Sequence, residues 1–314
     1  MFDPPPSPGP SRLLGLLGEM LPAAGVFNTA LEEVTLARAE RAFVKAPVLY
    51  EPKLMFICQG RKRGFFGEQT LVFDARRYLV AAVPLPFECE TEASVEEPLL
   101  AVGITIKLPV AAELILALDG LGARAAVPPL GIATAAMDAG MEDSLLRLLM
   151  ALRSPVEARL LGPGIVREIL YRMLTGEQGA AIAGALVHHS HCGRIGRALR
   201  RIHAEYAADL DVSRLAEEAG MGVAAFHSHF KQVTRTSPIQ YLKTTRLHKA
   251  RLLMAHEGLS ASTAAGRVGY ESASQFSREF KRFFGSTPRE EAERMKSVLV
   301  PTAAVSPYVS VQVQ

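Results

Sequence analysis

The chain has 314 residues, of which 49% are hydrophobic and 21% charged, a composition typical of a globular protein with room for two domains. No uninterrupted apolar run approaches the roughly 20 residues that a membrane helix needs, so we expect a cytoplasmic protein without a membrane partner. The three cysteines, Cys58, Cys89 and Cys192, are odd in number and lack paired spacing, which argues against a disulfide framework.

The net charge of +3 is unevenly distributed along the chain. Residues 1–187 carry 17 basic and 21 acidic side chains, a balance of −4, whereas residues 188–314 carry 18 and 11, a balance of +7. A basic C-terminal half fits a nucleic-acid footprint on one domain only. A chance difference between domains would account for the imbalance equally well.

The sequence pattern of the first half of the chain is typical of an antiparallel sheet. Residues 1–24 combine a proline-rich leader with a short amphipathic helix over 11–21. Between Val26 and Lys107, runs rich in β-branched and aromatic residues predict strands at 54–58, 70–73, 78–83 and 100–106. Because no helical segment separates these runs, they favour an antiparallel barrel or sandwich.

Helical patterns return at Pro109 and continue in pieces to about Leu174. One helix carries a leucine stripe, which either covers the barrel or forms a dimer helix; its residues are Leu145, Leu148, Leu149 and Leu152. Small residues over 176–184 predict a weakly structured connection. We therefore expect a domain over 25–180, a linker over 181–193, a helical domain over 194–296 and a loose tail over 297–314.

One pattern occurs twice near the C-terminus, fifty positions apart. Phe226-x-x-x-Phe230-Lys231 runs on to Ser237-Pro238, and Phe276-x-x-x-Phe280-Lys281 runs on to Thr287-Pro288. An Ala-rich stretch that ends in glycine precedes each copy, at 215–220 and 264–269. A short helix, a glycine turn and an amphipathic second helix outline a helix-turn-helix, and we place the two units at about 212–233 and 261–284.

A long helix over 239–256, begun by Ser237-Pro238, should hold the two units apart. If the phenylalanines, with Val233 and Phe283, pack inward, the opposite faces are free to contact DNA. In the first unit these residues are Ala224, His227, Ser228, Lys231 and Gln232. In the second they are Ser274, Gln275, Ser277, Arg278, Lys281 and Arg282. An all-helical bundle with aromatic core stripes would explain either copy alone, but the duplication favours DNA binding.

The run from Asp211 to Pro288 resembles the DNA-binding domain of the AraC/XylS family of bacterial transcription regulators. The resemblance rests on Tyr241-Leu242, Arg246-Leu247, Ala250, Gly269-Tyr270, Ser274, Phe276, Arg278, Phe280-Lys281 and Gly285-Ser286-Thr287-Pro288. It implies two recognition helices in major-groove segments roughly 34 Å apart on promoter or operator DNA. It also implies a homodimer that acts as an activator or a repressor of transcription, with RNA polymerase as a further partner.

The first unit departs from the family pattern. Ser228 stands where the family usually has arginine, and Gly222 and Ala224 replace serines at the helix start, so a cap is lost. Arg235 stands where glycine commonly ends the helix, although arginine disfavours the left-handed conformation. We expect this unit to be less specific or less stable than the second.

Residues of the first half are similar to the N-terminal domain found in one branch of the same family. They are Glu51-Pro52-Lys53 through Gln59-Gly60-Arg61-Lys62, Tyr78-Leu79, Pro84-Leu85-Pro86 and Ala93-Ser94-x-Glu96-x-Pro98. The resemblance implies an α+β multidomain protein: a cupin-like antiparallel β-barrel with helices, joined to an all-α double helix-turn-helix. The barrel would sense a small-molecule effector; alternatively, it is only a dimerisation scaffold.

Residue chemistry in the first half points away from an enzyme. All eight histidines lie at or beyond His188, so the barrel lacks a histidine-ligated metal, and we expect no cofactor and no catalysis. The run from His188 to Cys192 is too compact to wrap an ion and predicts a polar linker.

Two groups of residues in the barrel remain as candidate effector sites. Arg61, Lys62 and Arg63 could bind an anionic effector or form a solvated hairpin tip, and the tip is favoured. Cys58 and Cys89 could sense electrophiles, but Cys58 lies in an apolar strand and Cys89 between two glutamates, which disfavour thiolate.

Overall fold

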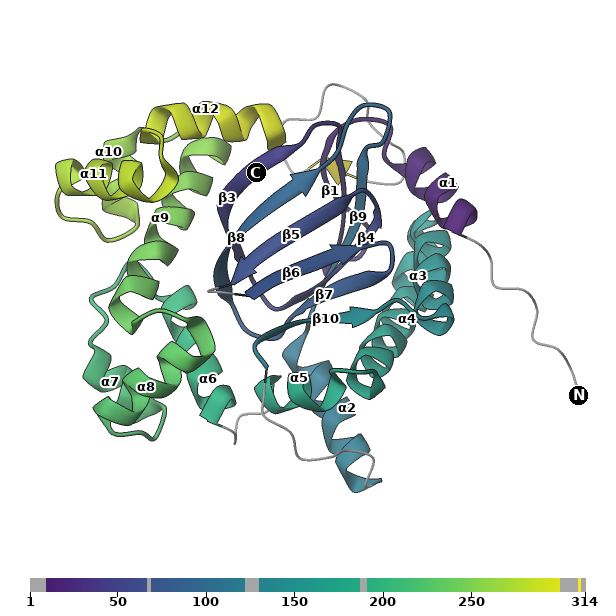
Figure 1. Ribbon diagram of the computed structural model, residues 1–314, viewed down its shortest axis with the longest axis horizontal. Coiled ribbons are helices and arrows are strands. Elements are labelled where there is room, and N and C mark those ends of the chain that lie inside the picture. The colour runs from purple at the N-terminus through teal and green to yellow at the C-terminus, as the bar shows by residue number, and fades with distance from the viewer. Residues whose placement is uncertain (1–9, 67–68, 122–129, 187–190, 300–309, 312–314) are drawn as a thin grey trace, which may run out of the picture.

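The computed structural model describes residues 10–66, 69–121, 130–186, 191–299 and 310–311. A curled antiparallel sheet occupies the centre of the molecule (Figure 1). Helices of the first half lie along one side of the sheet, and the C-terminal helices lie along the other. Among the described residues, no helix is long and apolar enough to cross a membrane.

The sheet has the strand order β11-β1-β2-β9-β4-β7-β6-β5-β8-β3, with β10 paired to β7. Every pairing is antiparallel, and the sheet curls into a half-barrel, which confirms the predicted fold class. The strands are β1 (Gly25–Asn28), β2 (Val34–Ala39), β3 (Phe43–Tyr50), β4 (Lys53–Gln59), β5 (Arg61–Phe66), β6 (Gln69–Asp74), β7 (Arg77–Ala81), β8 (Leu85–Glu92), β9 (Leu99–Thr105), β10 (Ile132–Ala136) and β11 (Ser310–Val311).

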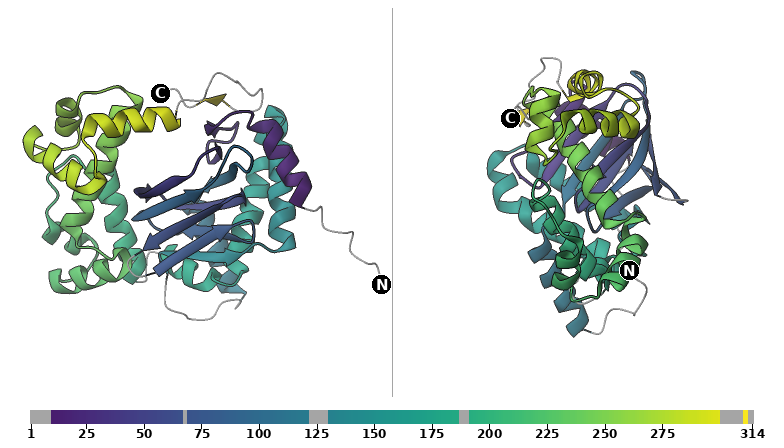
Figure 2. Two further views of the ribbon diagram at one scale, coloured as in Figure 1. Left: turned by 45° about the horizontal axis from the view of Figure 1, so that its top comes forward. Right: turned by 90° about the vertical axis from the view of Figure 1, so that its left-hand side faces the viewer.

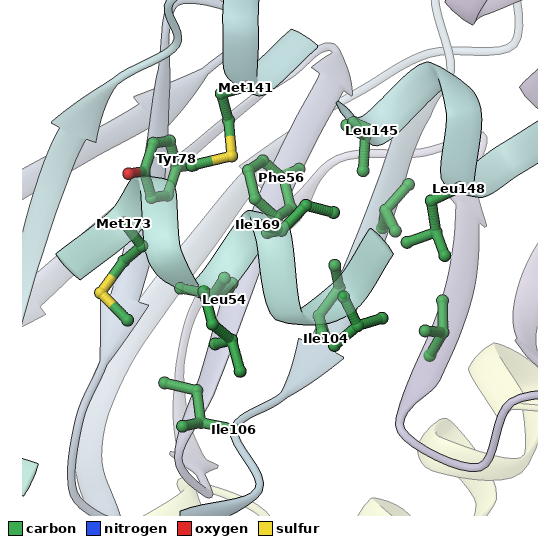
Figure 3. Close-up of a cluster of buried hydrophobic side chains, with 14 of the residues drawn as sticks. Leu54, Phe56, Tyr78, Ile104, Ile106, Met141, Leu145, Leu148, Ile169 and Met173 are labelled. Atoms are coloured by element: carbon green, nitrogen blue, oxygen red, sulfur yellow. The ribbon is translucent and has the colours of Figure 1, made fainter. Parts of the chain in front are cut away.

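Five helices belong to the first half of the chain. They are α1 (Pro10–Met20), α2 (Leu108–Gly120), α3 (Ala139–Leu152), α4 (Pro155–Thr175) and α5 (Gly179–Leu186). The leucine stripe lies on α3 and packs inward: Leu145, Leu148 and Leu149 are fully buried. Figure 3 shows Leu145 and Leu148 with Ile169 of α4 against Leu54, Phe56 and Ile104 of the sheet. The stripe therefore covers the sheet.

Strand alternation gives the sheet two different faces. On β4, Leu54 and Phe56 face the helices and are at most 1% exposed. Ile57 belongs to the cluster on the other face, where Met55 is half-buried. This second face, which we call the inner face, lies toward the C-terminal helices (Figure 2).

The C-terminal helices divide between two cores. They are α6 (His191–Ala204), α7 (Val212–Glu218), α8 (Val223–Thr234), α9 (Pro238–His256), α10 (Ala261–Arg267), α11 (Ala273–Phe284) and α12 (Pro288–Leu299). Phe226 and Phe230 of α8 belong to one continuous apolar cluster with Leu85 and Phe87 of the inner face. Phe276 and Phe280 of α11 lie in a separate cluster built only from the C-terminal helices.

Several expectations from the sequence are corrected by the structure. Strand β10 interrupts the expected helical stretch, because Ile132–Ala136 pairs with β7. Residues 179–186 form the buried helix α5, in place of a weakly structured connection, since alanine is the best helix former. Residues 188–190 of the histidine-rich run, and most of the tail, lie outside the described residues; Ser310–Val311 pairs with β1.

Candidate nucleic-acid interface

Each half of the duplicated pattern forms a short helix, a glycine turn and a second helix. In the first unit, α7 leads to Gly220 and then to α8; in the second, α10 leads to Gly269 and then to α11. Both glycines have positive φ angles, 63° and 84°, which side chains adopt only with strain. At Gly269 a Cβ atom would clash with the carbonyl oxygen of Ala207, so no larger residue fits.

The two recognition helices, α8 and α11, differ at both ends, as the sequence predicts. Ser272 caps α11 by accepting a hydrogen bond from the Gln275 amide at 3.2 Å, whereas Gly222 before α8 has no side chain to offer. At the other end Gly285 takes φ 77° after α11. Arg235 takes φ 60° after α8 and is the one non-glycine with positive φ in the described part of the chain. The first unit thus has the weaker termini.

The outward face of α11 is polar and basic. Of the six residues predicted to contact DNA there, Ser274, Gln275, Arg278, Lys281 and Arg282 are exposed and Ser277 is half-buried. The Ser277 hydroxyl donates a hydrogen bond to the Ala273 carbonyl oxygen, and the side-chain amide of Gln275 donates one to the Glu279 carboxylate at 3.2 Å. These internal bonds leave the three cationic side chains as the groups best placed to meet phosphates or base edges.

The corresponding face of α8 carries less charge. Ala224, Ser228, Lys231 and Gln232 are exposed and His227 is half-buried, so Lys231 is the one permanent cation among these five. The Gln232 carboxamide lies 3.2 Å from Nδ1 of His229. Each of the eleven predicted contact residues keeps at least part of its surface exposed while the C-terminal helices rest against the sheet.

The inward phenylalanines follow the predicted pattern with one change. Phe226, Phe230, Phe276 and Phe280 are fully buried. On α11 it is Phe284 that is buried, while Phe283 is half-buried against the His248 ring at 5.4 Å. The inward stripe continues at i+4 from Phe280, which follows the helical period more closely than i+3.

Glu279 positions α11, and it was not among the residues predicted from the sequence. Its carboxylate accepts hydrogen bonds from Lys243 of α9 and from the Tyr270 hydroxyl, both at 2.9 Å. Burial alone would raise the pKa of this carboxyl, but the bonds from Lys243, Gln275 and Tyr270 hold it below its ordinary value. A lone acid in a basic helix is the sequence signal that could have indicated this anchor.

The long helix α9 ties the second unit together. Arg246 donates to the carbonyl oxygens of Tyr206, Ala208 and Gly269 at 2.7–3.0 Å. Further along α9, Arg251 lies 3.3 Å from the fully buried carboxylate of Glu291 on α12. The 19 residues of α9 rise about 27 Å at about 1.5 Å per residue, so the helix spans the region between the units.

The first unit is joined to the sheet by polar contacts as well as by the shared core. The fully buried Tyr241 of α9 donates its hydroxyl proton to the Pro84 carbonyl at 2.8 Å and lies 2.7 Å from Nε2 of His203. Lys249 of α9 lies 3.5 Å from Glu51, in the turn between β3 and β4. Burial lowers the pKa of His203 to about 4, so this imidazole is neutral in the fold.

The three basic residues predicted as an anion site are separated by the sheet. They lie in strand β5, so the hairpin-tip interpretation was wrong. Arg61 and Arg63 are exposed on the outer side of the strand and form ion pairs with Asp74, Glu90 and Glu92. Lys62 is half-buried on the inner face, where burial lowers the pKa of its ammonium group but the nearby Tyr50 hydroxyl and Cys89 thiol raise it.

Cys58 and Cys89 are buried and unpaired. Burial raises the pKa of the Cys58 thiol to about 12. Burial also raises the pKa of Cys89 and outweighs the nearby charge of Lys62, which lowers it, while Glu90 adds to the rise. Both thiols therefore stay protonated, and thiolate is the reactive form. Neither environment supports the electrophile-sensor hypothesis.

Comparison with known proteins identifies the class. Residues 30–181 match the family model "AraC-type transcriptional regulator N-terminus", and residues 215–294 match the model "Helix-turn-helix domain". Together with the paired recognition helices and the half-barrel, these matches show that the chain belongs to the AraC/XylS family of transcription regulators.

Individual relatives are similar over different parts of the chain. The HTH-type transcriptional activator RhaS of Escherichia coli O139:H28 is 31% identical over 97 residues, which are 31% of this chain and 35% of RhaS. The chain thus aligns with about a third of the length of this relative. A crystal structure of ToxT from Vibrio cholerae O395 has a similar fold, with a TM-score of 0.57 at 13% identity over 83% of this chain and 98% of ToxT. A second ToxT structure, from strain SCE256, has a TM-score of 0.53 at 11% identity over 85% and 96%.

Proposed function

We propose that this regulator binds promoter or operator DNA through α8 and α11 together, with α11 supplying most of the sequence readout. The observation that carries the proposal is the unequal pair of exposed faces. Arg278, Lys281 and Arg282 project from a capped helix, whereas Lys231 alone projects from an uncapped one. Arginine gives the commonest specific base contact, and a firmly held helix positions it better.

We further propose that the half-barrel makes DNA binding responsive to a small molecule. The inner face and the first unit share one apolar core, so a change at that face reaches α8 through packed side chains. The similar ToxT structures are described as bound to (E)-4-(8-methylnaphthalen-1-yl)but-3-enoic acid and to an unsaturated fatty acid. A homodimer that activates transcription with RNA polymerase in the cytoplasm, without catalysis, completes the proposal.

Purified full-length protein should be incubated with fragmented genomic DNA, and the bound fragments sequenced. The proposal predicts a shared motif with two half-elements about one helical turn apart, the one read by α11 being the more invariant. Genes next to the bound fragments would indicate the chemical class of the effector. Fragments without a common motif would contradict sequence-specific regulation.

The alternative is a half-barrel that acts only as a dimerisation scaffold. A thermal-shift screen of metabolites, followed by DNA binding with each stabilising compound, separates the two roles. A compound that stabilises the protein and changes its DNA affinity supports the effector role. The absence of any such compound supports the scaffold.

A further inference from the structure

Gln275 lies exposed near the start of α11, yet its side chain is held by the protein. Its Nε2 donates a hydrogen bond to Oε1 of Glu279, one helical turn further along, at 3.2 Å. Its backbone amide donates to the Ser272 hydroxyl, also at 3.2 Å. Both the main chain and the side chain of Gln275 are therefore restrained before any DNA is bound.

Glu279 is itself anchored by two groups outside α11. Nζ of Lys243 on α9 donates to the same Oε1 at 2.9 Å, and the Tyr270 hydroxyl, from the turn before α11, donates to Oε2 at 2.9 Å. Only 14% of the Glu279 side chain is exposed. A carboxylate with partners on both oxygens has little freedom to rotate, so it holds Gln275 against a fixed point.

The charge of Glu279 decides which way the Gln275 carboxamide points. Burial would raise the pKa of Glu279, but the hydrogen bonds that it accepts keep the pKa below its ordinary value, so the group is ionised at neutral pH. An ionised carboxylate only accepts hydrogen bonds, so the NH₂ group of Gln275 faces it and the carbonyl oxygen does not. That bond uses one of the two N–H groups and leaves the second N–H and Oε1 as a donor and an acceptor.

A donor and an acceptor side by side match one base edge in the major groove. Adenine presents its N6 amino group and its N7 acceptor there, and glutamine pairs with both at once. Guanine presents two acceptors, cytosine a donor alone, and thymine an acceptor beside its methyl group. Adenine is thus the one base whose edge is complementary to both free groups of the carboxamide.

We infer that α11 reads an adenine through Gln275, which Glu279 holds in the orientation for a bidentate contact. Gln275 is the residue that touches the base. Glu279 is a positioning residue, supported by Lys243 and Tyr270, and does not itself touch DNA. The inference deepens the proposed readout by α11 and rests on that proposed function.

The adenine should lie close to the base that Arg278 reads. The two residues are about 4.5 Å apart along α11, since an α-helix rises about 1.5 Å per residue. Successive base pairs follow at about 3.4 Å, so the two side chains reach base pairs that are adjacent or separated by one. Arginine pairs bidentately with guanine, and the half-element read by α11 should therefore contain a guanine and an adenine at this spacing.

The first unit has no equivalent of this arrangement. Fifty positions earlier in the duplicated pattern, Ala225 stands in place of Gln275 and His229 in place of Glu279. An alanine side chain has no group that donates or accepts a hydrogen bond. The half-element read by α8 should therefore show no adenine preference from this position.

Selection of bound sequences from a randomised DNA library by the purified full chain measures the base preference at each position. The inference predicts an adenine in the α11 half-element that is preferred about tenfold or more over each other base. Gln275→Ala should abolish this preference and keep that for the neighbouring guanine. Gln240→Ala is the matched control and should change neither preference, because Gln240 follows a serine cap in the same way but lies exposed on α9.

Two further variants test the positioning role of Glu279. Glu279→Ala, and Lys243→Met from outside α11, should each lower the adenine preference about threefold or more and keep the guanine preference. If Glu279 only stabilised the fold, both preferences would fall together. Thermal melting verifies that all four variants are folded.

The outcomes separate this inference from the proposed function. A common motif without a preferred adenine in the α11 half-element overturns the inference and leaves the proposed DNA binding intact. The same holds for an adenine preference that survives Gln275→Ala, or for equal loss of both preferences in Glu279→Ala. A library that yields no common motif overturns the proposed function and the inference together.

Discussion

The two helix-turn-helix units share a sequence pattern but differ in what supports them. The first packs its phenylalanines into the core of the half-barrel and has weak helix termini. The second has a core of its own, a serine cap and a glycine C-terminus. The first unit therefore shares its core with the half-barrel. The second has a core made of C-terminal helices only, and it meets the sheet through contacts of α11 with β3 and of α12 with β1. On the proposed function, the first copy of the duplicated motif couples DNA binding to the half-barrel and the second carries most of the DNA readout.

The largest predicted difference follows from the separate cores. Phe280→Ala should lower the free energy of unfolding of α10–α12 by about 3–5 kcal/mol, because a fully buried aromatic ring is removed. Hydrogen exchange of backbone amides should accelerate in these helices and stay slow in β7 and β8. Phe230→Ala, the matched change, should instead accelerate exchange in α8 and in those strands. If both variants accelerated amide exchange in the same helices and strands, the division into two cores would be contradicted.

Loss of one hydroxyl should loosen the first unit from the half-barrel. Tyr241→Phe removes the bond to the Pro84 carbonyl and leaves His203 without that neighbour, at a cost of about 1–3 kcal/mol. Urea unfolding followed by exchange should show α6 and α8 opening before the sheet. Tyr270→Phe, which loses the bond to Glu279, is the control and should affect the second unit only.

The residues that end the two recognition helices, Arg235 and Gly285, can each be replaced by the residue type of the other. Arg235→Gly should raise the free energy of unfolding by about 0.5–1 kcal/mol, since glycine takes a positive φ without strain. Gly285→Arg should lower it by about 1 kcal/mol for the same reason. Thermal unfolding measures both. Shifts in the same direction would show that the left-handed residues do not distinguish the units.

The smallest effect concerns the helix starts. Gly222→Ser should stabilise the first unit by a few tenths of a kcal/mol through a new cap, and Ser272→Gly should destabilise the second by a similar amount. Amide exchange at the first turn of each helix reports the change. Slower amide exchange at the start of α8 without tighter DNA binding would indicate that fraying of this helix does not limit the DNA affinity of the first unit.

The sequence indicated features set by local chemistry. Phe226, Phe230, Phe276 and Phe280 follow the helical period, and the missing cap at Gly222 and the strained Arg235 can be seen from residue types alone. Strand runs such as 54–58 were also evident, because residues on β4 are apolar on both faces.

Features that depend on distant partners could not be predicted. Lys62 lies on the opposite face from Arg61 and Arg63 because β5 is a strand between β6 and β8. The sequence did not predict this strand, since Gly60 and Gly64 interrupt the apolar pattern there. The contact between Tyr241 and Pro84 joins residues 157 positions apart, and no local pattern encodes it. The same holds for the shared core, whose members come from both halves of the chain.

The most direct test of the unequal readout compares Arg278→Ala with Ser228→Ala in binding to the same genomic motif. Both side chains are exposed at equivalent positions of α11 and α8, so neither change should disturb folding. Arg278→Ala should weaken specific binding by about 1–3 kcal/mol, with relaxed base preference in one half-element, and Ser228→Ala should cost much less. Equal losses at the two positions, or a larger loss at Ser228, would contradict the claim that the second unit carries most of the readout.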